Sequence, residues 1–469
     1  MRVSSIARGQ LVGGDDPIEK GGSRIVEVPS VIARLNVFAD CFKFQTRRSA
    51  YCEGSYSGAD VIIDVGTPAG AAPPLYYALV APPLMVSNSA KGVQPTRALS
   101  ALISAALIAS AITLARASGA SRFFLVSMFA VLTPNAISIT AVVNPSSLEI
   151  SSALLLWTAS LLLLTDEASK SRPLNRVLVI AAGVAGVLFV SSRALSPLWL
   201  ALIGGVVAVS SSWSRMTALA RRTDVRVAAA AIFAAGLLAV AWIRTEQPLA
   251  SQSKLGLHRK GWEAIAFAAG HLGFVYRSGV ALLGWDYEAP SAVILLWSVV
   301  LGSIVLLGLA LSSRKVRIAA LLLAAVALVV PVLIEASQLD TLGPTWQGRY
   351  TLPLIMGVPL LCGLALDRLD RPVSETLRRL TPWLLGTMAV AQFVAFYFTL
   401  RRYVVGVNGP VWFPGADDWQ PPFPAAVVVG LALVAVTLLY GWLARIASAD
   451  GPAVDAVVNG VPGMTRSHE

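Results

Sequence analysis

Charged residues are scarce in this sequence. They make up 13% of its 469 residues, whereas hydrophobic residues make up 56% and the mean hydropathy is +0.69. A soluble domain cannot have this balance, because its water-facing positions must be largely polar. The scarcity of charge therefore excludes an ordinary soluble protein.

Histidine and cysteine are also rare, with three residues of each type. His258, His271 and His468 are too few for a His-rich metal site, so the sequence predicts no metal site and leaves any divalent-metal requirement open. The motifs of P-loop nucleotide binding, zinc proteases, dithiol sites and serine hydrolases are missing. No cofactor is indicated.

Basic residues outnumber acidic ones, 37 to 26, which gives a net charge of +11. Nucleic-acid-binding proteins gather such charge in one patch or stripe. Here the basic residues are dispersed among short connections between apolar segments. The sequence therefore predicts no nucleic-acid partner, and the dispersed charge indicates membrane topology.

Long apolar runs recur along the whole chain. Most have about 18 or more nearly uncharged residues, enough to cross roughly 30 Å of hydrocarbon as a helix. The runs lack the alternation of membrane strands, and only helices or closed barrels satisfy backbone groups in lipid. The sequence predicts an all-α, polytopic transmembrane helical bundle, with the lipid bilayer as its partner and about eleven spans at 98–116, 122–142, 147–164, 174–191, 194–211, 226–243, 291–311, 316–335, 351–367, 381–400 and 424–446.

The Lys and Arg residues sort to one side of these spans. Connections on that side include Arg116, Arg222 and Lys315, whereas the short connections on the other side hold few basic residues. By the positive-inside rule the basic side faces the cytoplasm. This orientation predicts an outer segment 1–97, a bundle 98–446 with outer loops 244–290, 336–350 and 401–423, and a polar cytoplasmic tail 447–469.

The first outer segment has two notable features. Residues 75–88 are apolar but too short to cross, and they contain Pro82 and Pro83, so they predict a helix lying in the membrane interface. Cys41 and Cys52 lie close together in the sequence, and in an oxidising compartment they could close a small loop as a disulfide. Two free thiols are the alternative.

Polar residues at the outer ends of spans are the main site candidates, because an ionisable group there is costly without a partner or a role. In VVNPSSLEI, Ser146 or Ser147 can cap a helix whose first turn holds Glu149, where the helix dipole favours a carboxylate. Either the segment only begins a helix, or Asn144 and Glu149 face an outer cavity that binds substrate.

Arginines are the second kind of candidate, since their planar fork of donors suits a phosphate. Arg193 stands in a short outer connection, and TWQGRYTLPL places Gln347, Arg349 and Tyr350 just before a span. We predict that these residues bind a donor phosphate or substrate, with Tyr76 as a further candidate. The alternatives are arginines that snorkel to lipid phosphates and tyrosines of an interfacial aromatic belt.

Two carboxylates could act as a general base. Asp60 and Asp64 are the acidic residues nearest to the predicted interfacial helix, and a positioned carboxylate can take the proton of a reacting hydroxyl. We predict a catalytic role for one of them. The alternative is a solvated acidic loop.

Six motifs in order carry a resemblance to a known family. They are ARGQLVG (Ala7 to Gly13), PPLYYALV (Pro73 to Val80), VNPSSLEI (Val143 to Ile150), SRALSPLWLALI (Ser192 to Ile203), QGRYTLPL (Gln347 to Leu354) and RRYVVGVNGP (Arg401 to Pro410). Over nearly the whole chain they resemble the bacterial membrane-protein family called domain of unknown function 2142 (DUF2142). That family is grouped with the GT-C glycosyltransferases, which transfer a sugar from a polyprenyl-phosphate donor outside the membrane.

The resemblance implies a GT-C-like fold in a bacterial plasma membrane, a polyprenyl-phosphate-linked sugar as donor and a glycan acceptor under the outer loops. It also implies a carboxylate base in the first outer loop. Arg193 and Arg349 are the candidates for holding the phosphate. Family members have a further span, an acidic DEP-type motif and a histidine before the ARGQLVG stretch. Because this chain starts just before that stretch and shows no signal-peptide pattern, we expect an N-terminally truncated copy of a twelve-span protein.

The leading interpretation is a membrane glycosyltransferase of cell-envelope glycan assembly, or an inactive shortened remnant of one. Two alternatives stay open, a transporter or flippase of a lipid-linked sugar and a non-catalytic membrane scaffold. Transporters often show matching broken helices in two halves of the chain. No internal repeat stands out here, which favours the enzyme.

Overall fold

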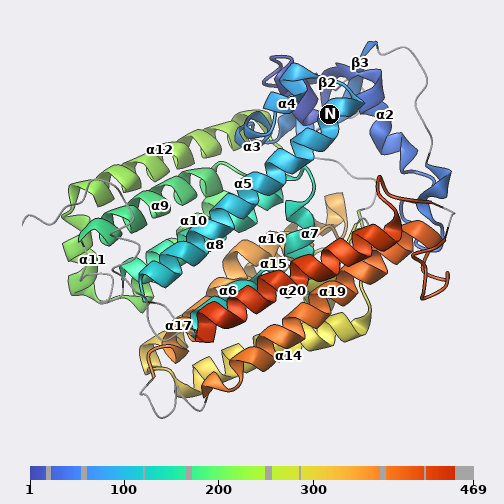
Figure 1. Cartoon of the computed structure of the whole chain (residues 1–469). Helices are drawn as coiled ribbons and strands as arrows, with labels where there is room; N and C mark the ends of the chain where they lie inside the picture. The colour runs from blue at the N-terminus through green and yellow to red at the C-terminus, as the bar shows by residue number, and fades with distance from the viewer. Residues whose placement is uncertain are drawn as a thin grey trace, which may run out of the picture.

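The computed structural model describes residues 1–16, 23–53, 61–119, 122–164, 172–248, 256–284, 287–369, 377–416 and 419–448. Within these ranges the chain is mainly α-helical, with one small sheet. The long helices form a bundle, and the N-terminal strands and short helices gather at one end of it (Figure 1). We call this end the sheet end.

Nine helices in the described ranges are long and apolar enough to cross a membrane, which confirms the predicted membrane bundle. They form where the sequence predicts spans, because in lipid a helix satisfies its own backbone groups. α16 and α17 together make one of the nine. The helices are α5 (Ala90–Ala117), α8 (Pro145–Leu163), α9 (Arg172–Val190), α12 (Thr223–Glu246), α14 (Ser291–Leu311), α15 (Arg314–Leu342), α16 (Gly348–Ile355) with α17 (Gly357–Leu366), α19 (Thr381–Val405) and α20 (Ala425–Ser448).

The second predicted span is broken. α6 (Arg122–Val131) and α7 (Pro134–Thr140) meet with a bend of 68°. Pro134 has no N–H to bond the carbonyl oxygen of Ala130, one helical turn before it. Trp297 Nε1 donates to that oxygen instead, at 2.8 Å. Pro134 therefore bends the span without leaving this buried carbonyl unpaired.

The fifth predicted span is shorter than expected. It is α10 (Ser196–Ser210), and the small helix α11 (Trp213–Ala220) follows it. By length and apolar composition the described ranges therefore hold nine candidate spans, or ten if α6 and α7 count as one bent span, and α10 is the further apolar helix at the place of the predicted fifth span.

The N-terminal segment contains a sheet that the sequence analysis did not predict. β1 (Gly14–Asp15), β2 (Arg24–Pro29) and β3 (Ile62–Thr67) form a three-stranded antiparallel sheet in that order. Buried valines of β2 pack against α2 (Ser30–Phe38). α1 (Arg2–Ala7) lies beside β2. This small unit covers part of the sheet end of the bundle (Figure 1).

The predicted interfacial helix 75–88 consists of two short helices. η2 (Pro68–Ala71), a single turn of 3₁₀ helix, leads into α3 (Leu75–Leu79), and α4 (Pro82–Val86) follows. Pro82 begins α4, because proline lacks the N–H that an uninterrupted helix needs. Both tyrosines of α3 are buried in the main hydrophobic core. Much of this segment is therefore held by protein contacts.

The predicted outer loops are partly helical. The loop 244–290 contains α13 (Gly261–Ala281), which packs against α15 and α16. His271 Nδ1 of α13 lies 2.9 Å from Oε1 of Glu335, a buried residue of α15. α15 also extends to Leu342 and α19 to Val405, so parts of the loops 336–350 and 401–423 are helical.

The end of the bundle opposite the sheet is rich in arginine, and we call it the basic end. Residues 449–469 of the predicted tail lie outside the described residues. Helix termini at the basic end carry Arg116, Arg122, Arg172, Arg222, Arg314 and Arg368.

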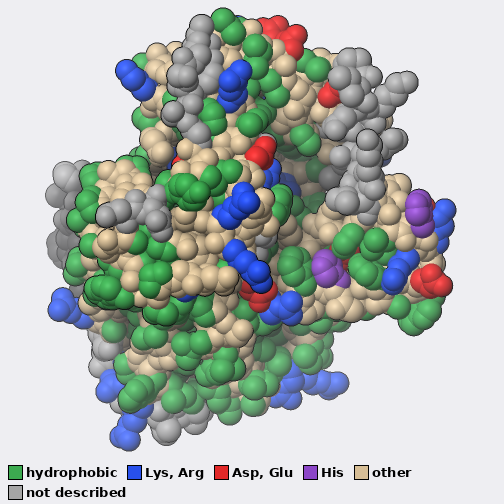
Figure 2. Space-filling view, turned by 90° about the vertical axis from the view of Figure 1, so that its right-hand side faces the viewer, with side chains coloured by type: hydrophobic (Ala, Val, Ile, Leu, Met, Phe, Trp, Pro, Cys, Tyr) green, Lys and Arg blue, Asp and Glu red, His purple; other side chains and the backbone are tan. Residues whose placement is uncertain are grey.

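Figure 2 views the molecule from the right-hand side of Figure 1, and this face is hollowed below the N-terminal segment at its top.

A disulfide and a buried arginine attach the loops of the sheet end to the bundle. Cys41 is bonded to Cys52, which lies in η1 (Ala50–Cys52), and their Cα atoms are 6.1 Å apart. Arg402 of α19 is 2% exposed and donates to the carbonyl oxygen of Phe42 at 2.6 Å. Arg402 therefore has a structural role, because this contact joins α19 to the loop that the disulfide closes, residues 41–52.

Close helix packing leads to a first prediction. A Cβ at Gly363 of α17 would clash with Ser127 Oγ and the carbonyl oxygen of Phe123. Gly363→Ala is therefore expected to lower the free energy of unfolding by about 1–3 kcal/mol, because overpacking forces neighbouring atoms apart. Gly386→Ala in α19 is the matched control, since a Cβ there meets nothing within 4 Å. Equal thermal midpoints for the two variants in detergent would contradict this packing.

Candidate functional site

The start of α8 positions the first candidate residues. Asn144 Oδ1 accepts a hydrogen bond from the backbone N–H of Ser146 at 2.9 Å, and Pro145 takes the first helical position. Asn144 therefore caps the helix, a role that the sequence analysis gave to Ser146 or Ser147. Glu149 lies beyond the first turn rather than in it. The Glu149 carboxylate is buried inside the bundle.

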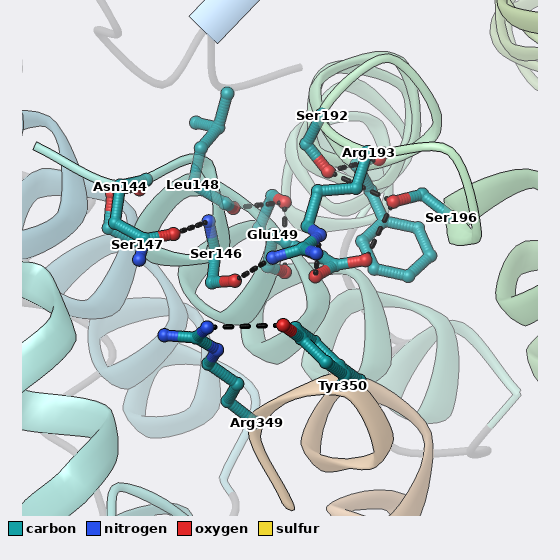
Figure 3. A network of polar contacts seen from close by, with 12 residues as sticks. Asn144, Ser146, Ser147, Leu148, Glu149, Ser192, Arg193, Ser196, Arg349 and Tyr350 are labelled. Carbon is teal, nitrogen blue, oxygen red and sulfur yellow. Dashed lines mark hydrogen bonds and ion pairs between the residues drawn. The ribbon is translucent and has the colours of Figure 1, made fainter. Parts of the chain in front are cut away.

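Glu149 is the centre of a buried polar cluster. Its side chain is 1% exposed. Ser196 Oγ at the start of α10 donates to Glu149 Oε1 at 2.7 Å, and Arg193 Nε lies 3.7 Å from Oε2. Arg193 also donates from Nη1 to Ser146 Oγ, so its guanidinium lies between two groups of α8 (Figure 3). A carboxylate at this depth needs such partners to stay charged.

Arg349 and Tyr350 complete the cluster from α16. Arg349 Nη2 donates to Tyr350 Oη at 3.1 Å, and its Cζ lies 5.1 Å from the centre of the Tyr350 ring. Arg193 approaches the same ring, with its Cζ at 4.6 Å from the centre. Figure 3 shows Arg349 and Tyr350 facing Ser146, Glu149 and Arg193 from the opposite helix. Two guanidinium groups therefore converge on one phenol.

Close backbone packing against α13 fixes the position of the start of α16. Gly348 N donates to Ser278 Oγ of α13 at 2.8 Å, and a Cβ at Gly348 would clash with the backbone of Gly279. Thr133 Oγ1 and Asn135 Nδ2, at the bend between α6 and α7, donate to the carbonyl oxygens of Gly279 and Ser278, both at 2.7 Å. Because Arg349 follows Gly348 directly, this packing sets where Arg349 lies.

The tyrosines of α3 line the other side of the cluster. Tyr76 Oη lies 2.9 Å from Ser100 Oγ, which lies 3.3 Å from Ser147 Oγ at the start of α8. Burial raises the pKa of Tyr77 to about 12, and the nearby positive charges of Arg193 and Arg2 oppose that rise. The Tyr77 phenol is therefore neutral at physiological pH.

Arg2 is a residue of this region that the sequence analysis did not single out. It is 2% exposed and donates from Nη2 to the carbonyl oxygens of Leu11 at 2.6 Å and Ala72 at 3.3 Å. Burial lowers its pKa, and the nearby Tyr77 and Glu246 act in the opposite direction. No local signal marks it, because the residues between Arg2 and the ARGQLVG motif, VSSI, mix serine with apolar residues.

Gln347 and Asp64 take no part in the described contacts of the cluster. Gln347 precedes α16 and makes no side-chain capping bond. Asp64 is exposed on β3, opposite Glu27 of β2. Asp60 lies outside the described residues. Within the part of the chain that the structure describes, no group of three or more His, Cys, Asp and Glu side chains could hold a metal ion.

The arrangement is suited to binding an anion. Arg193 and Arg349 carry two positive charges against the single carboxylate of Glu149, which leaves one positive charge in excess. Arg349 Nε is buried and has no hydrogen-bond partner among the residues that the structure describes. Buried guanidinium groups with free donors favour phosphate or carboxylate ligands, which can accept several charge-assisted hydrogen bonds.

Comparison with known proteins gives one match. A family described as "Predicted membrane protein (DUF2142)" has a model that matches residues 2–358. This range contains Arg2 and all the cluster residues of α3, α8, α10 and α16. It confirms the resemblance to the family and includes five of the six motifs, whereas RRYVVGVNGP lies beyond it. No curated protein and no solved structure matches the chain.

The ion pair leads to a second prediction. Glu149→Ala leaves Arg193 without its carboxylate, and we expect the free energy of unfolding to fall by about 3 kcal/mol, the low end for a buried pair, because Arg193 is 27% exposed. Glu149→Gln should cost less, since its amide oxygen still accepts from Ser196. Asp64→Ala, at an exposed carboxylate, should stay within about 0.5 kcal/mol. Thermal unfolding in detergent that leaves Glu149→Ala as stable as Asp64→Ala would refute the role of the pair.

Proposed function

The chain belongs to the DUF2142 family of predicted membrane proteins, and from its polar cluster we propose that it is a membrane glycosyltransferase. The donor is a polyprenyl-phosphate-linked sugar, and the acceptor is a glycan of the cell envelope. One observation carries this proposal, the convergence of Arg193 and Arg349 on Tyr350 beside the buried Glu149. The resemblance to GT-C glycosyltransferases supports the choice of a lipid-linked sugar.

The position of the cluster suits the phosphate of a lipid. Arg193 and Arg349 lie at the sheet-end termini of membrane helices, where a lipid headgroup lies when its tail stays in the bilayer. Arg193 is partly committed to Glu149 and Ser146, whereas Arg349 has a buried Nε without a partner. Arg349 therefore provides the stronger phosphate contact, and Arg193 provides a second one from the connection between α9 and α10.

In the proposed reaction a hydroxyl oxygen of the acceptor attacks the anomeric carbon of the donor sugar. The bond from that carbon to the phosphate oxygen breaks, and the polyprenyl phosphate leaves with both electrons of the bond. Arg193 and Arg349 stabilise the charge that develops on the phosphate. The hydroxyl proton goes to a carboxylate, for which Asp60 and Asp64 remain the predicted candidates. Glu149 positions Arg193 instead.

The proposed location is a bacterial plasma membrane, with the sheet end outside and the C-terminus in the cytoplasm. The arginines at the basic end support this orientation by the positive-inside rule. The disulfide between Cys41 and Cys52 at the sheet end is consistent with it, because disulfides persist in oxidising compartments.

A flippase of a lipid-linked sugar is the second candidate. The bent pair of α6 and α7 favours it, since many transporters bind their substrate at discontinuous membrane helices. A non-catalytic scaffold is the third candidate. A flippase moves the labelled lipid across a vesicle bilayer and leaves its sugar attached, whereas the proposed enzyme releases the sugar to an acceptor.

The third prediction concerns the phosphate contact. In membranes containing the full chain and a labelled polyprenyl-phosphate sugar, Arg349→Ala should lower turnover by about 100-fold or more, the range seen when a donor to a developing charge is removed. Arg349→Lys should recover only part of it, because an ammonium group lacks the planar fork. The measured quantity is label transferred to glycan.

Arg97→Ala is the matched control for this experiment. Arg97 is an exposed arginine near the sheet-end start of α5, and its Nε donates to the carbonyl oxygen of Ala141 at 3.4 Å. Its loss should leave turnover unchanged. Turnover by Arg349→Ala that equals turnover by Arg97→Ala would remove Arg349 from the site. Movement of intact lipid without transfer would favour the flippase.

A further inference from the structure

A groove of about 940 Å³ lies between α9 and α12, far from the polar cluster. Its walls are mainly apolar, and several wall residues are strongly exposed, such as Ile180 at 55%, Val184 at 50% and Val227 at 64%. In a membrane these side chains face lipid. The groove begins at Arg176 and Arg222, at the basic end of the two helices.

The length of the groove matches one leaflet. Along α9 it runs from Arg176 to Leu188, about 18 Å at 1.5 Å per residue, which is close to half of a hydrocarbon core of roughly 30 Å. Near its inner end a Cβ at Gly186 of α9 would clash with Ile232 of α12. The two helices are therefore in contact at this level, and the residues of α12 that line the groove end at Ala231, just before it.

The mouth of the groove is positively charged. Arg222 forms two hydrogen bonds with Asp224, from Nε at 3.0 Å and from Nη2 at 2.6 Å. Arg176 is exposed, and none of the described residues pairs with it. Among the described residues that line the groove, two arginines and one aspartate leave one positive charge in excess. An apolar groove that ends in such a mouth is complementary to an acyl chain below a phosphate.

We propose that this groove binds an anionic phospholipid of the leaflet at the basic end. One acyl chain lies between α9 and α12, and the headgroup phosphate contacts Arg176 and Arg222. Basic sites between membrane helices are known to hold anionic headgroups. A partner helix fits less well, because it would need an apolar groove along the full membrane thickness, whereas the lining of this groove on α12 ends at Ala231, fifteen residues before the helix ends.

The bound lipid would stabilise α12. Of the apolar window of α12 only 6% is buried inside the protein, and α9 is its main neighbour. An acyl chain in the groove adds contacts to both helices. This site is independent of the proposed glycosyl transfer, because it lies at the opposite end of the bundle.

The proposal is tested with the purified full chain in detergent. It is titrated with phosphatidylglycerol that carries a fluorescent acyl chain, and binding is followed by anisotropy. Arg176→Ala should weaken the affinity about fivefold, as expected for one surface charge. Val184→Trp should abolish binding, because the indole fills the groove from an exposed position. Phosphatidylcholine with the same label should bind more weakly to the unmodified protein.

Two control variants keep the test specific. Arg445→Ala removes an exposed arginine at the basic end of α20, and Val434→Trp adds the same bulk to α20 at a residue that is 55% exposed. Neither should change the affinity. Equal effects of Arg176→Ala and Arg445→Ala, or equal affinity for both lipids, would overturn the proposal. A protein dimer that Val184→Trp dissociates would assign the groove to a second copy of the chain instead.

Discussion

A carboxylate buried among membrane helices needs a cation within reach, and this constraint organises the sheet end of the bundle. α8 is deeply enclosed, with 94% of its apolar window buried, and Glu149 lies near its start. Arg193 reaches Glu149 from the connection between α9 and α10, and Ser196 reaches it from α10. These two polar contacts therefore join α8 to α10 and to the connection that follows α9. They also leave Arg193 facing Tyr350.

The crossing helices could be predicted because hydropathy alone decides them. A long uncharged run has few options other than a membrane helix. The bend at Pro134 could also have been predicted, since proline frees a carbonyl that another group must satisfy. α13 could not be predicted as part of the bundle. It carries Glu263, His271 and Arg277, which interrupt the apolar pattern. His271 pairs with Glu335 of α15 and Arg277 pairs with Glu288, and no local pattern shows these contacts. The sheet was missed because its longer strands have only six residues each.

The site could be predicted residue by residue but not as an arrangement. Glu149, Arg193 and Arg349 were found because a charge beside an apolar run is conspicuous. Their meeting depends on how α8, α10 and α16 pack, which no local pattern contains. Ser196 was missed because a serine before a proline reads as an ordinary helix start. Tyr77 was missed because an interfacial belt explains any tyrosine at such a place equally well.

The central claim is that Arg193 and Arg349 hold one phosphate between them. Both guanidinium groups lie within 6 Å of the centre of the Tyr350 ring. The most direct measurement is an experimental structure of the full chain with a bound polyprenyl-phosphate sugar. The account predicts phosphate oxygens within about 3.2 Å of nitrogen atoms of both arginines. A phosphate bound away from both arginines would contradict it.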